Sequence, residues 1–354
     1  MTDAAVAEVA RLHGPGDVRV GREPVAAPGP GEVLVGIAAV GLCGSDLHWY
    51  RGAGIGDVAL GAPLVLGHEF SGVILEGPRT GERVVGDPAD PCGICDPCLD
   101  GRSNVCVSPR FAGFGTADGA LRTVMPWPDR LLHGVPDALG DDEAALLEPL
   151  GVALHALDLA PPVMGGRAGV YGSGPLGLLL VQLLRLAGAA VVVATDRLPH
   201  RVAAARAMGA SHAFVVGDDA GPDAPSRHSP ARDVEVDVAF ETAGSDEALS
   251  DAIAAVRPGG RVVIVGIPEG DRSAFPAGLA RRKEITLQLS RRMVPGDLVR
   301  AIALARSCKV DLGALITHRY TLEGAPDAFA TLASRAGLKV IVHPSPAVIA
   351  GQAR

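Results

Sequence analysis

Residues 170–196 read VYGSGPLGLLLVQLLRLAGAAVVVATD and hold a glycine-rich turn between apolar segments. The turn, 172–177, matches the pattern G-x-G-x-x-G and directly follows the end of an apolar strand. A helix is predicted over 178–186, and a buried strand over 190–194. A strand, a glycine turn, a helix and a second strand together form the first unit of a doubly wound parallel sheet.

Each glycine of this turn has a physical role in binding a dinucleotide. Gly172 allows the tight turn, Gly174 lets the backbone approach a pyrophosphate, and Gly177 lets helix and strand pack closely. Asp196 ends the next strand, where its carboxylate would accept hydrogen bonds from the ribose hydroxyls and repel a 2′-phosphate. We therefore expect NAD as the cofactor, with Arg197 and Arg201 leaving NADP as the alternative. The predicted cofactor-binding residues are Gly172, Gly174, Pro175, Leu176, Gly177, Asp196, Arg201 and Thr242.

Strands and helices alternate after the glycine turn, whereas the first third of the chain is β-rich. The alternation predicts strands at 212–216, 236–240 and 261–265 with helices at 199–208 and 246–256, and a loop at 217–232. Before residue 141 short apolar runs, 32–40 and 72–76, lie between Gly/Pro turns, and helical periodicity is weak. Residues 141–157 read as a helix.

Two groups of metal-binding residues precede the glycine turn. Cys92, Cys95, Cys98 and Cys106 follow the spacing C-x2-C-x2-C-x7-C, which suits a closed tetrahedral zinc site of the structural kind. Cys43 and His68 lie outside that cluster and could hold a second metal with an open position. One closed and one open site on a single chain indicate a metalloenzyme.

Composition narrows the class further. The chain has 354 residues, 48% of them hydrophobic, and a net charge of −8, which argues against nucleic-acid binding. The apolar stretch 175–194 is interrupted by Gln182 and Arg185, so it predicts a helix and a strand, not a membrane span. The N-terminus lacks the features of a secretory signal, and we expect a cytoplasmic protein. Cys308 is predicted to be a core residue.

The motifs occur in a characteristic order. Gly41-Leu42-Cys43-Gly44-Ser45-Asp46 comes first, then Gly67-His68-Glu69, the cysteine cluster, Leu147-Glu148-Pro149-Leu150 and the glycine turn. From Pro28 to Val342 the chain resembles the zinc-dependent medium-chain dehydrogenases, and most closely their polyol branch of sorbitol, L-idonate and threonine dehydrogenases.

This resemblance implies an α/β fold of two domains. A GroES-like β-rich catalytic domain would comprise residues 1–155 and 290–354, and a doubly wound Rossmann domain residues 156–289. The branch commonly forms homotetramers or homodimers, and the strand at 285–289 could pair with its twin.

The resemblance also implies the metal ligands. Cys43 and His68 match the catalytic zinc ligands, and Glu148 matches the third ligand, either directly or through water. Glu69 would bind the metal directly or support its ligands from behind. With the cysteine cluster, two zinc ions per chain are expected.

The proton path and the substrate contacts follow from the same resemblance. Ser45 would take the alcohol proton, His48 would relay it, and Asp46 would orient the metal ligands. The predicted substrate contacts are Trp49, Tyr50, Arg291 and Arg292. The implied reaction is NAD-linked oxidation of a secondary alcohol on a polyol; L-idonate, an aminocyclitol, butanediol or threonine are alternative substrates. A non-catalytic dinucleotide-binding protein is the alternative outside this class.

Overall fold

The computed structural model describes residues 6–217 and 230–344 of the chain. It divides into two compact units, Met1–Pro149 with Val294–Arg354, and Leu150–Met293. The limits of these units differ by a few residues from the predicted limits at 155 and 289. The loop predicted at 217–232 lies mostly outside the described residues.

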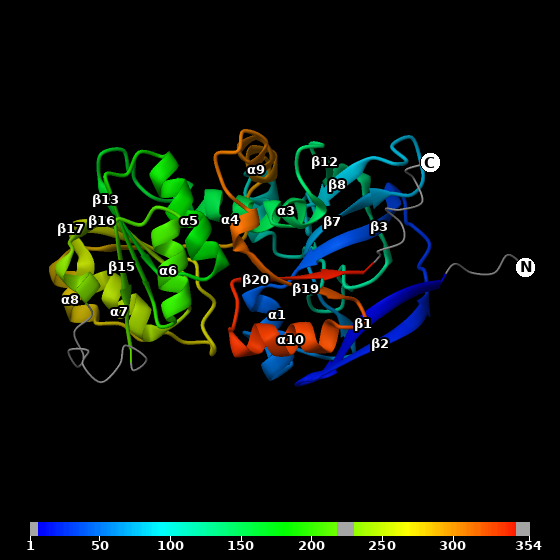
Figure 1. Cartoon of the computed structure of the whole chain (residues 1–354), viewed down its shortest axis with the longest axis horizontal. Helices are drawn as coiled ribbons and strands as arrows, with labels where there is room; N and C mark the ends of the chain where they lie inside the picture. The colour runs from blue at the N-terminus through cyan, green and yellow to red at the C-terminus, as the bar shows by residue number, and fades with distance from the viewer. Residues whose placement is uncertain (1–5, 218–229, 345–354) are drawn as a thin grey trace, which may run out of the picture. The chain divides into compact units, whose positions relative to one another are not determined.

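A seven-stranded sheet forms the centre of the first unit. Its strands follow the order β12-β8-β7-β3-β20-β19, and β11 also pairs with β3. The strands are β3 (Glu32–Gly41), β7 (Glu69–Ile74), β8 (Arg83–Gly86), β11 (Val124–Pro128), β12 (Leu132–Gly134), β19 (Ile316–Thr321) and β20 (Lys339–His343). Since β20 pairs with β3, the end of the chain completes a sheet begun near its start (Figure 1, red and blue).

A smaller sheet and short elements complete this unit. The smaller sheet has the order β2-β1-β6. Its strands are β1 (Val6–Gly14), β2 (Asp17–Pro24) and β6 (Leu64–Val65). The short elements and helices are β4 (Gly54–Ile55), β5 (Val58–Ala59), β9 (Ala89–Asp90), β10 (Arg110–Phe111), α1 (Gly44–Gly52), α2 (Asp96–Leu99), α3 (Asp141–Ala145), α9 (Asp297–Arg306), α10 (Ala325–Ser334) and the 3-10 turns Ser103–Val105, Asp129–Leu131 and Gly313–Leu315.

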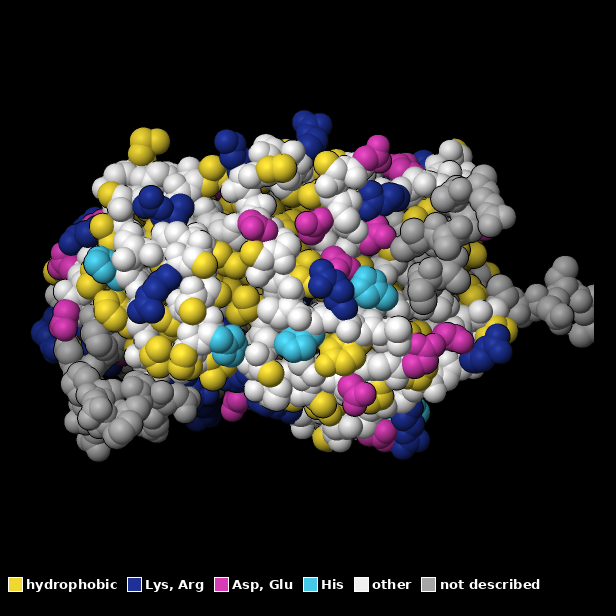
Figure 2. Space-filling model, viewed as in Figure 1, with side chains coloured by type: hydrophobic (Ala, Val, Ile, Leu, Met, Phe, Trp, Pro, Cys, Tyr) yellow, Lys and Arg dark blue, Asp and Glu magenta, His cyan; other side chains and the backbone are white. Residues whose placement is uncertain are grey.

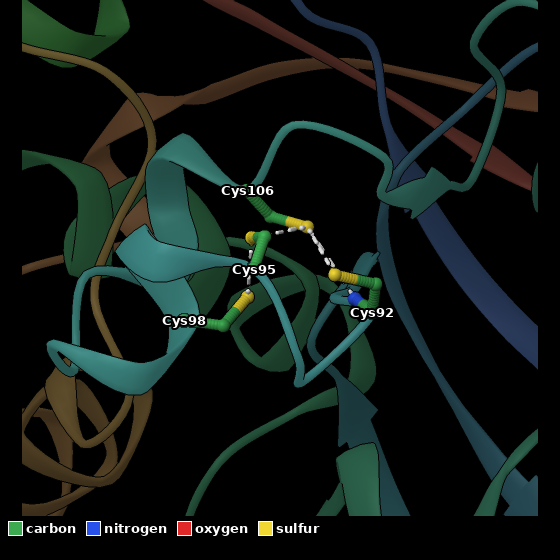
Figure 3. Close-up of side chains that lie close together, drawn as sticks. All are labelled: Cys92, Cys95, Cys98 and Cys106. Atoms are coloured by element: carbon green, nitrogen blue, oxygen red, sulfur yellow. Dashed lines mark hydrogen bonds between the residues drawn. The ribbon is translucent and has the colours of Figure 1, made fainter.

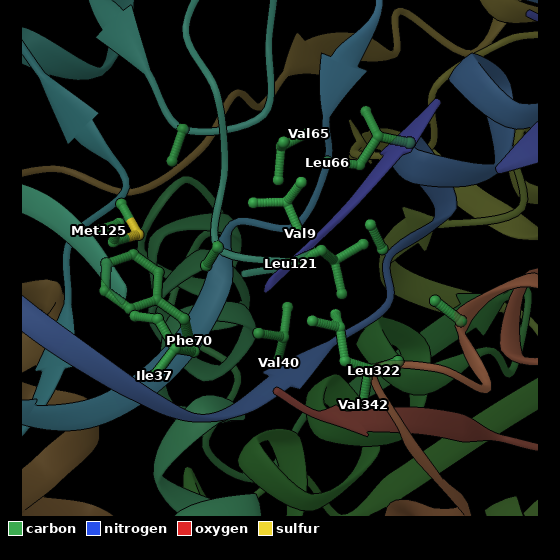
Figure 4. Close-up of a cluster of buried hydrophobic side chains, with 14 of the residues drawn as sticks. Val9, Ile37, Val40, Val65, Leu66, Phe70, Leu121, Met125, Leu322 and Val342 are labelled. Carbon is green, nitrogen blue, oxygen red and sulfur yellow. The ribbon is translucent and has the colours of Figure 1, made fainter. Parts of the chain in front are cut away.

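The core of the first unit draws on both ends of the chain. Figure 4 shows Val9 and Val40 in one cluster with Leu322 and Val342. All four side chains are at most 2% exposed. Burial of aliphatic side chains from segments far apart in the sequence therefore joins the two pieces into one unit.

The structure corrects three expectations for this unit. Helix α1 was not predicted, because its nine residues mix polar and apolar side chains and have a glycine at each end, so they carry no apolar stripe. The single helix predicted over 141–157 is two, since α3 ends before Leu146 and α4 (Leu147–Asp158) follows. Cys308 is exposed, in a left-handed conformation just after α9, and is not a core residue.

The second unit is a six-stranded parallel sheet with the order β15-β14-β13-β16-β17-β18. Its strands are β13 (Arg167–Tyr171), β14 (Val191–Asp196), β15 (His212–Val215), β16 (Val236–Glu241), β17 (Val256–Ile264) and β18 (Thr286–Leu289). Its helices are α5 (Pro175–Leu186), α6 (Pro199–Ala207), α7 (Asp246–Ala255) and α8 (Ala277–Arg282), with a 3-10 turn at Pro230–Asp233. The predicted strands and helices of this unit agree with these bounds to within a few residues, apart from the start of β17.

The apolar stretch 175–194 divides into α5 and β14, as predicted. In the described part of the chain, no helix is both long and apolar enough to cross a membrane. Figure 2 shows Lys and Arg side chains interspersed with Asp and Glu side chains on the face drawn. On that face, the negative net charge is therefore not gathered into one patch.

Candidate functional site

Cys43 is placed by the start of helix α1. It occupies the N-cap position, and its backbone N–H donates to Asp46 Oδ2 over 2.9 Å. This bond satisfies an amide that would otherwise lack a partner at the helix start. Asp46 is 1% exposed, so its carboxylate holds the Cys43 backbone in a fixed position.

The same carboxylate also orients His68. Asp46 Oδ1 accepts a hydrogen bond from the Gly67 backbone N–H at 3.3 Å and lies 3.6 Å from His68 Nδ1. With Nδ1 toward Asp46, Nε2 lies 3.4 Å from Ser45 Oγ. Gly67 has a φ of +91°, and an added Cβ would lie 2.7 Å from Val40. Glycine is therefore required immediately before the histidine.

Cys43, His68 and Glu69 together form a candidate cation site. One ligand atom from each lies within 4.8 Å of the others. Burial alone would lower the pKa of His68, but Asp46 and Cys43 beside the ring raise it well above its ordinary value. The surroundings thus favour positive charge at this point. A thiolate, an imidazole and a carboxylate are ligands that zinc accepts, so the residues fit the ion.

Glu69 has a second partner, which sequence reasoning missed. Its carboxylate forms an ion pair with Lys339, the first residue of β20. Glu69 opposes Gly41 in the β3–β7 ladder, where an added Cβ would lie 2.1 Å from Glu69 Oε2. A lone lysine at the start of a buried apolar strand was the available signal, but nothing in the sequence names its partner.

Glu148 lies near this group but outside it. Among the described residues, the set of mutually close ligand atoms comprises Cys43, His68 and Glu69. Burial raises the pKa of Glu148; His68 opposes this, while the charge of Glu69 raises the pKa further. Of the two carboxylates left open by the sequence, Glu69 is the one grouped with the cysteine and the histidine.

The four-cysteine cluster forms a separate site (Figure 3). The sulfur atoms of Cys95 and Cys98 lie 3.4 Å apart, those of Cys95 and Cys106 3.8 Å, and those of Cys106 and Cys92 3.5 Å. With Zn–S bonds of about 2.3 Å, a tetrahedron of sulfurs has edges of about 3.8 Å. Backbone N–H groups of Val107 and Cys98 lower the pKa of Cys95 to about 6. The cluster therefore fits zinc.

The glycine turn of the second unit has the geometry of a dinucleotide cradle. Gly172 has a φ of +111°, and a Cβ on Gly177 would lie 1.9 Å from the Gly172 carbonyl oxygen. Gly174 caps α5, with Pro175 at the first turn, so the helix N-terminus faces the turn. These features fit a pyrophosphate without further rearrangement.

Asp196 is tied to this turn. Its carboxylate accepts hydrogen bonds from the backbone N–H groups of Ser173 at 2.8 Å and Leu198 at 2.9 Å. Arg201 Nη1 lies 3.9 Å from Asp196 Oδ2 and near Gly174. Thr242 Oγ1 donates to the Gly172 carbonyl over 2.6 Å, which places this predicted cofactor residue beside the turn.

The structure gives less support to the predicted substrate contacts and to the predicted proton relay. Trp49 is 1% exposed and packs edge-on against Phe114, so its burial disfavours a substrate contact. Tyr50 stacks on Phe329 of α10, with ring centroids 5.2 Å apart. His48 lies half-buried on α1, three residues after Ser45. Arg291 and Arg292 belong to the second unit, and their role stays a prediction.

One aromatic residue near the metal ligands was not anticipated. The half-buried ring of Phe111, on β10, lies 5.4 Å from the ring of His68. It presents an apolar surface beside a metal ligand. Phe111 and Phe114 both lie in a Gly/Ala-rich loop, and the sequence does not indicate which of them approaches the histidine.

Known proteins share both parts of this architecture. Residues 29–137 match the family model for the alcohol dehydrogenase GroES-like domain, and residues 175–307 match that for zinc-binding dehydrogenases. Sorbitol dehydrogenase of Bacillus subtilis is 33% identical over 347 residues, covering 96% of this chain and 97% of the relative.

Solved structures agree over nearly the whole chain. L-idonate 5-dehydrogenase from Escherichia coli has a TM-score of 0.87 at 26% identity, covering 96% of this chain and 98% of its own. A zinc-binding dehydrogenase from Sinorhizobium meliloti, bound to NADP, has a TM-score of 0.83 at 30% identity, covering 96% and 100%. An alcohol dehydrogenase from Escherichia coli, complexed with NADH, has a TM-score of 0.84 at 27% identity, covering 96% and 99%.

These matches confirm the predicted α/β fold, with a GroES-like part and a Rossmann part, and they confirm the predicted class of enzyme. The Cys–His–Glu group, with its buried histidine and glutamate, and the glycine cradle would hold the metal and the nicotinamide cofactor on which that class depends. The chain therefore belongs to the zinc-binding medium-chain alcohol dehydrogenases, in the branch that includes the sorbitol dehydrogenases.

Proposed function

We propose that this protein oxidises a secondary alcohol of a polyol or a related sugar derivative to a ketone and reduces NAD. The observation that carries the proposal is the group of half-buried Cys43 and buried His68 and Glu69 with a hydroxyl beside it, since Ser45 Oγ lies 3.4 Å from His68 Nε2. The relative from Bacillus subtilis is named a sorbitol dehydrogenase, which supports a polyol as the substrate.

The residues of the chain have separable roles in this reaction. When bound by these ligands, zinc supplies Lewis acidity that lowers the pKa of a hydroxyl group. Ser45 accepts the proton of the substrate hydroxyl, and His48, three residues further along α1, passes it toward solvent. Asp46 keeps Cys43 and His68 in place through its two carboxylate oxygens. A nicotinamide cofactor held by the glycine turn would supply the acceptor for the hydride of the carbinol carbon.

We further propose two zinc ions per chain and a preference for NAD over NADP. The two ligand groups have different chemistry, four thiols in one and a mixed Cys–His–Glu set in the other. A carboxylate at Asp196 would repel a 2′-phosphate, whereas Arg201 beside it would attract one. The backbone amides of Ser173 and Leu198 hold the carboxylate at the strand end, and this supports NAD.

The test measures formation of NADH from NAD, or of NADPH from NADP, by the zinc-loaded protein. The substrates are sugar alcohols, L-idonate, aminocyclitols, butanediol and threonine. Turnover on one stereochemical series of polyols with NAD supports the proposal. Turnover confined to threonine or to butanediol would show that the proposed substrate class is wrong. No turnover with any of these substrates, in a protein that holds two zinc ions and binds NADH, would favour a non-catalytic role.

We also propose that two copies associate through β18. This strand ends the order of the parallel sheet, and Leu289 at its end is 72% exposed. An exposed edge strand of this kind can pair with its symmetry mate. Light scattering should find a dimer or tetramer for the parent and a smaller species for Leu289→Lys. An unchanged mass for the variant would place the interface elsewhere.

A further inference from the structure

Glu241, the last residue of β16, is a buried carboxylate that the reaction above does not use. It is 2% exposed, and its Oε1 accepts hydrogen bonds from the backbone N–H groups of Ala243 at 2.8 Å and Gly244 at 2.7 Å. The backbone carbonyl of the same residue accepts hydrogen bonds from the N–H groups of Val265 at 2.8 Å and Gly266 at 3.0 Å. Glu241 thus holds the main chain of two loops, one through its carboxylate and the other through its backbone carbonyl.

The surroundings of the Glu241 carboxylate act on its pKa in two directions. Burial raises the pKa of Glu241, whereas the backbone amides around it act in the opposite direction. Oε1 accepts from both amides, so an apolar side chain of similar size would leave two buried N–H groups without an acceptor. The arrangement therefore depends on an acceptor at this position, not merely on a side chain of this size.

The two loops are interlocked with the glycine turn. Thr242 donates its hydroxyl to the Gly172 carbonyl, and a Cβ on Gly172 would lie 2.7 Å from the Ala243 nitrogen. A Cβ on Gly266 would lie 2.2 Å from the Gly244 nitrogen. Residues 242–245 and 265–267 thus approach each other and the turn as closely as backbones allow.

The position of these loops in the sheet indicates which part of the cofactor they serve. In a doubly wound sheet the dinucleotide lies at the carboxyl ends of the strands, with one half on each side of the switch point. Here the order β14-β13-β16-β17 places Asp196, which suits the adenosine ribose, on one side of β13. The loops after β16 and β17 lie on the other side, where the nicotinamide half belongs.

We propose that Glu241 is a positioning residue for the nicotinamide half of the cofactor, because its carboxylate holds the backbone of Ala243 and Gly244 and its own carbonyl holds that of Val265 and Gly266. The inference rests on the nicotinamide cofactor of the proposed function. It predicts that loss of the carboxylate weakens contacts to the nicotinamide half and leaves those to the adenosine half intact.

The experiment compares two ligands that differ in the nicotinamide. NADH and ADP-ribose are titrated by calorimetry into the parent and into Glu241→Leu, with Glu247→Leu as control, since Glu247 is an exposed acid on neighbouring α7. We expect the NADH Kd of Glu241→Leu to rise about tenfold, the cost of leaving buried donors without their acceptor. The ADP-ribose Kd should stay within about twofold of the parent, and the control should match the parent for both ligands.

A second variant guards against misfolding. Thr242→Val keeps the shape of the side chain and removes only the hydroxyl that donates to Gly172. It should show the same selective loss of NADH binding in smaller measure. Equal loss of both ligands, or no loss of either, in the folded variants would overturn the proposal. Failure of the parent to bind NADH would instead overturn the cofactor site itself.

Discussion

Lys339 forms a buried ion pair with Glu69, one of the three candidate metal ligands. Lys339 Nζ lies 2.8 Å and 2.7 Å from the two carboxylate oxygens of Glu69 and 3.0 Å from the carbonyl oxygen of Leu42. The two side chains are 3% and 1% exposed. The lysine thus joins β20 to the start of β7 and to the residue before Cys43, so one cation holds three segments of the site together.

Lys339→Met should lower the free energy of unfolding by about 3–5 kcal/mol, because it leaves the carboxylate of Glu69 buried without its partner. Urea denaturation measures the loss, with the exposed Lys309→Met as control. In a double-mutant cycle with Glu69→Gln, the two losses should be far from additive. Additive losses would mean that the pair contributes no coupling.

Gly41→Ala should weaken zinc binding at the Cys43 site by about 10–100-fold, the usual effect of disturbing the groups that orient metal ligands. The added Cβ would lie 2.1 Å from Glu69 Oε2 and so would displace that carboxylate. Competition with a chromogenic chelator measures the affinity. Gly21→Ala is the matched control, since its Cβ would meet nothing within 4 Å. Unchanged affinity in Gly41→Ala would show that Glu69 does not support the metal.

Removal of single cysteines should separate the two metal sites. Cys43→Ser should retain one zinc ion per chain and its fold, and lose turnover. Cys98→Ser should also retain one zinc ion but should mainly lose stability, because a closed four-cysteine site contributes folding energy. Elemental analysis and thermal unfolding measure both effects. Loss of both metals in each variant would contradict this division of roles.

Asp196→Ala should weaken NAD binding and reduce discrimination against NADP by at least about tenfold, because a carboxylate beside a 2′-phosphate is strongly unfavourable. The substitution also removes the acceptor for the Ser173 and Leu198 amides. Asp196→Asn separates the two effects, since it removes the charge and keeps one oxygen. The ratio of kcat/KM for the two cofactors is the measurement. An unchanged ratio in both variants would remove Asp196 from cofactor selection.

The stability of the protein in acid should depend on Asp237, the second residue of β16. Burial raises the pKa of Asp237, but Arg167 and Arg257 together lower it below its ordinary value. A lowered pKa in the folded state stabilises the protein above the unfolded pKa, and this stability is lost as pH falls through the folded value. Asp237→Asn should therefore lower Tm at neutral pH, and the difference should shrink as the pH falls below the ordinary aspartate pKa of 3.8. The exposed Asp271→Asn is the control; a difference that persists at pH 2 would contradict the assignment.

The cysteine cluster and the glycine turn could be predicted because their residues lie close together in the sequence. Only two, two and seven residues separate successive cysteines of the cluster, so one loop is enough to bring the four sulfurs together. The turn between β13 and α5 likewise needs only its own glycines to form a cradle. The parallel sheet was predictable for a related reason, since strand and helix alternate in short, regular units.

Other parts of the site depended on distant segments. Helix α1 carries Ser45, Asp46 and His48, yet its residues show no helical pattern, and it packs against α10, where Tyr50 stacks on Phe329. Trp49 was expected at the substrate and is in the core, because the helix face on which it lies turns toward Phe114. Alternation of polar and apolar residues does not indicate which side of so short a helix is buried.

The chain alone therefore indicated the family, the glycine cradle, the four-cysteine cluster and the pair Cys43 and His68, because each depends on motifs in which neighbouring residues act together. It could not establish that Glu69 joins Cys43 and His68, or that Lys339 balances its charge from 270 residues away. Those contacts exist only because β20 pairs with β3 and β3 pairs with β7. The register of strands far apart in the sequence depends on burial of the whole sheet, and no short segment encodes it.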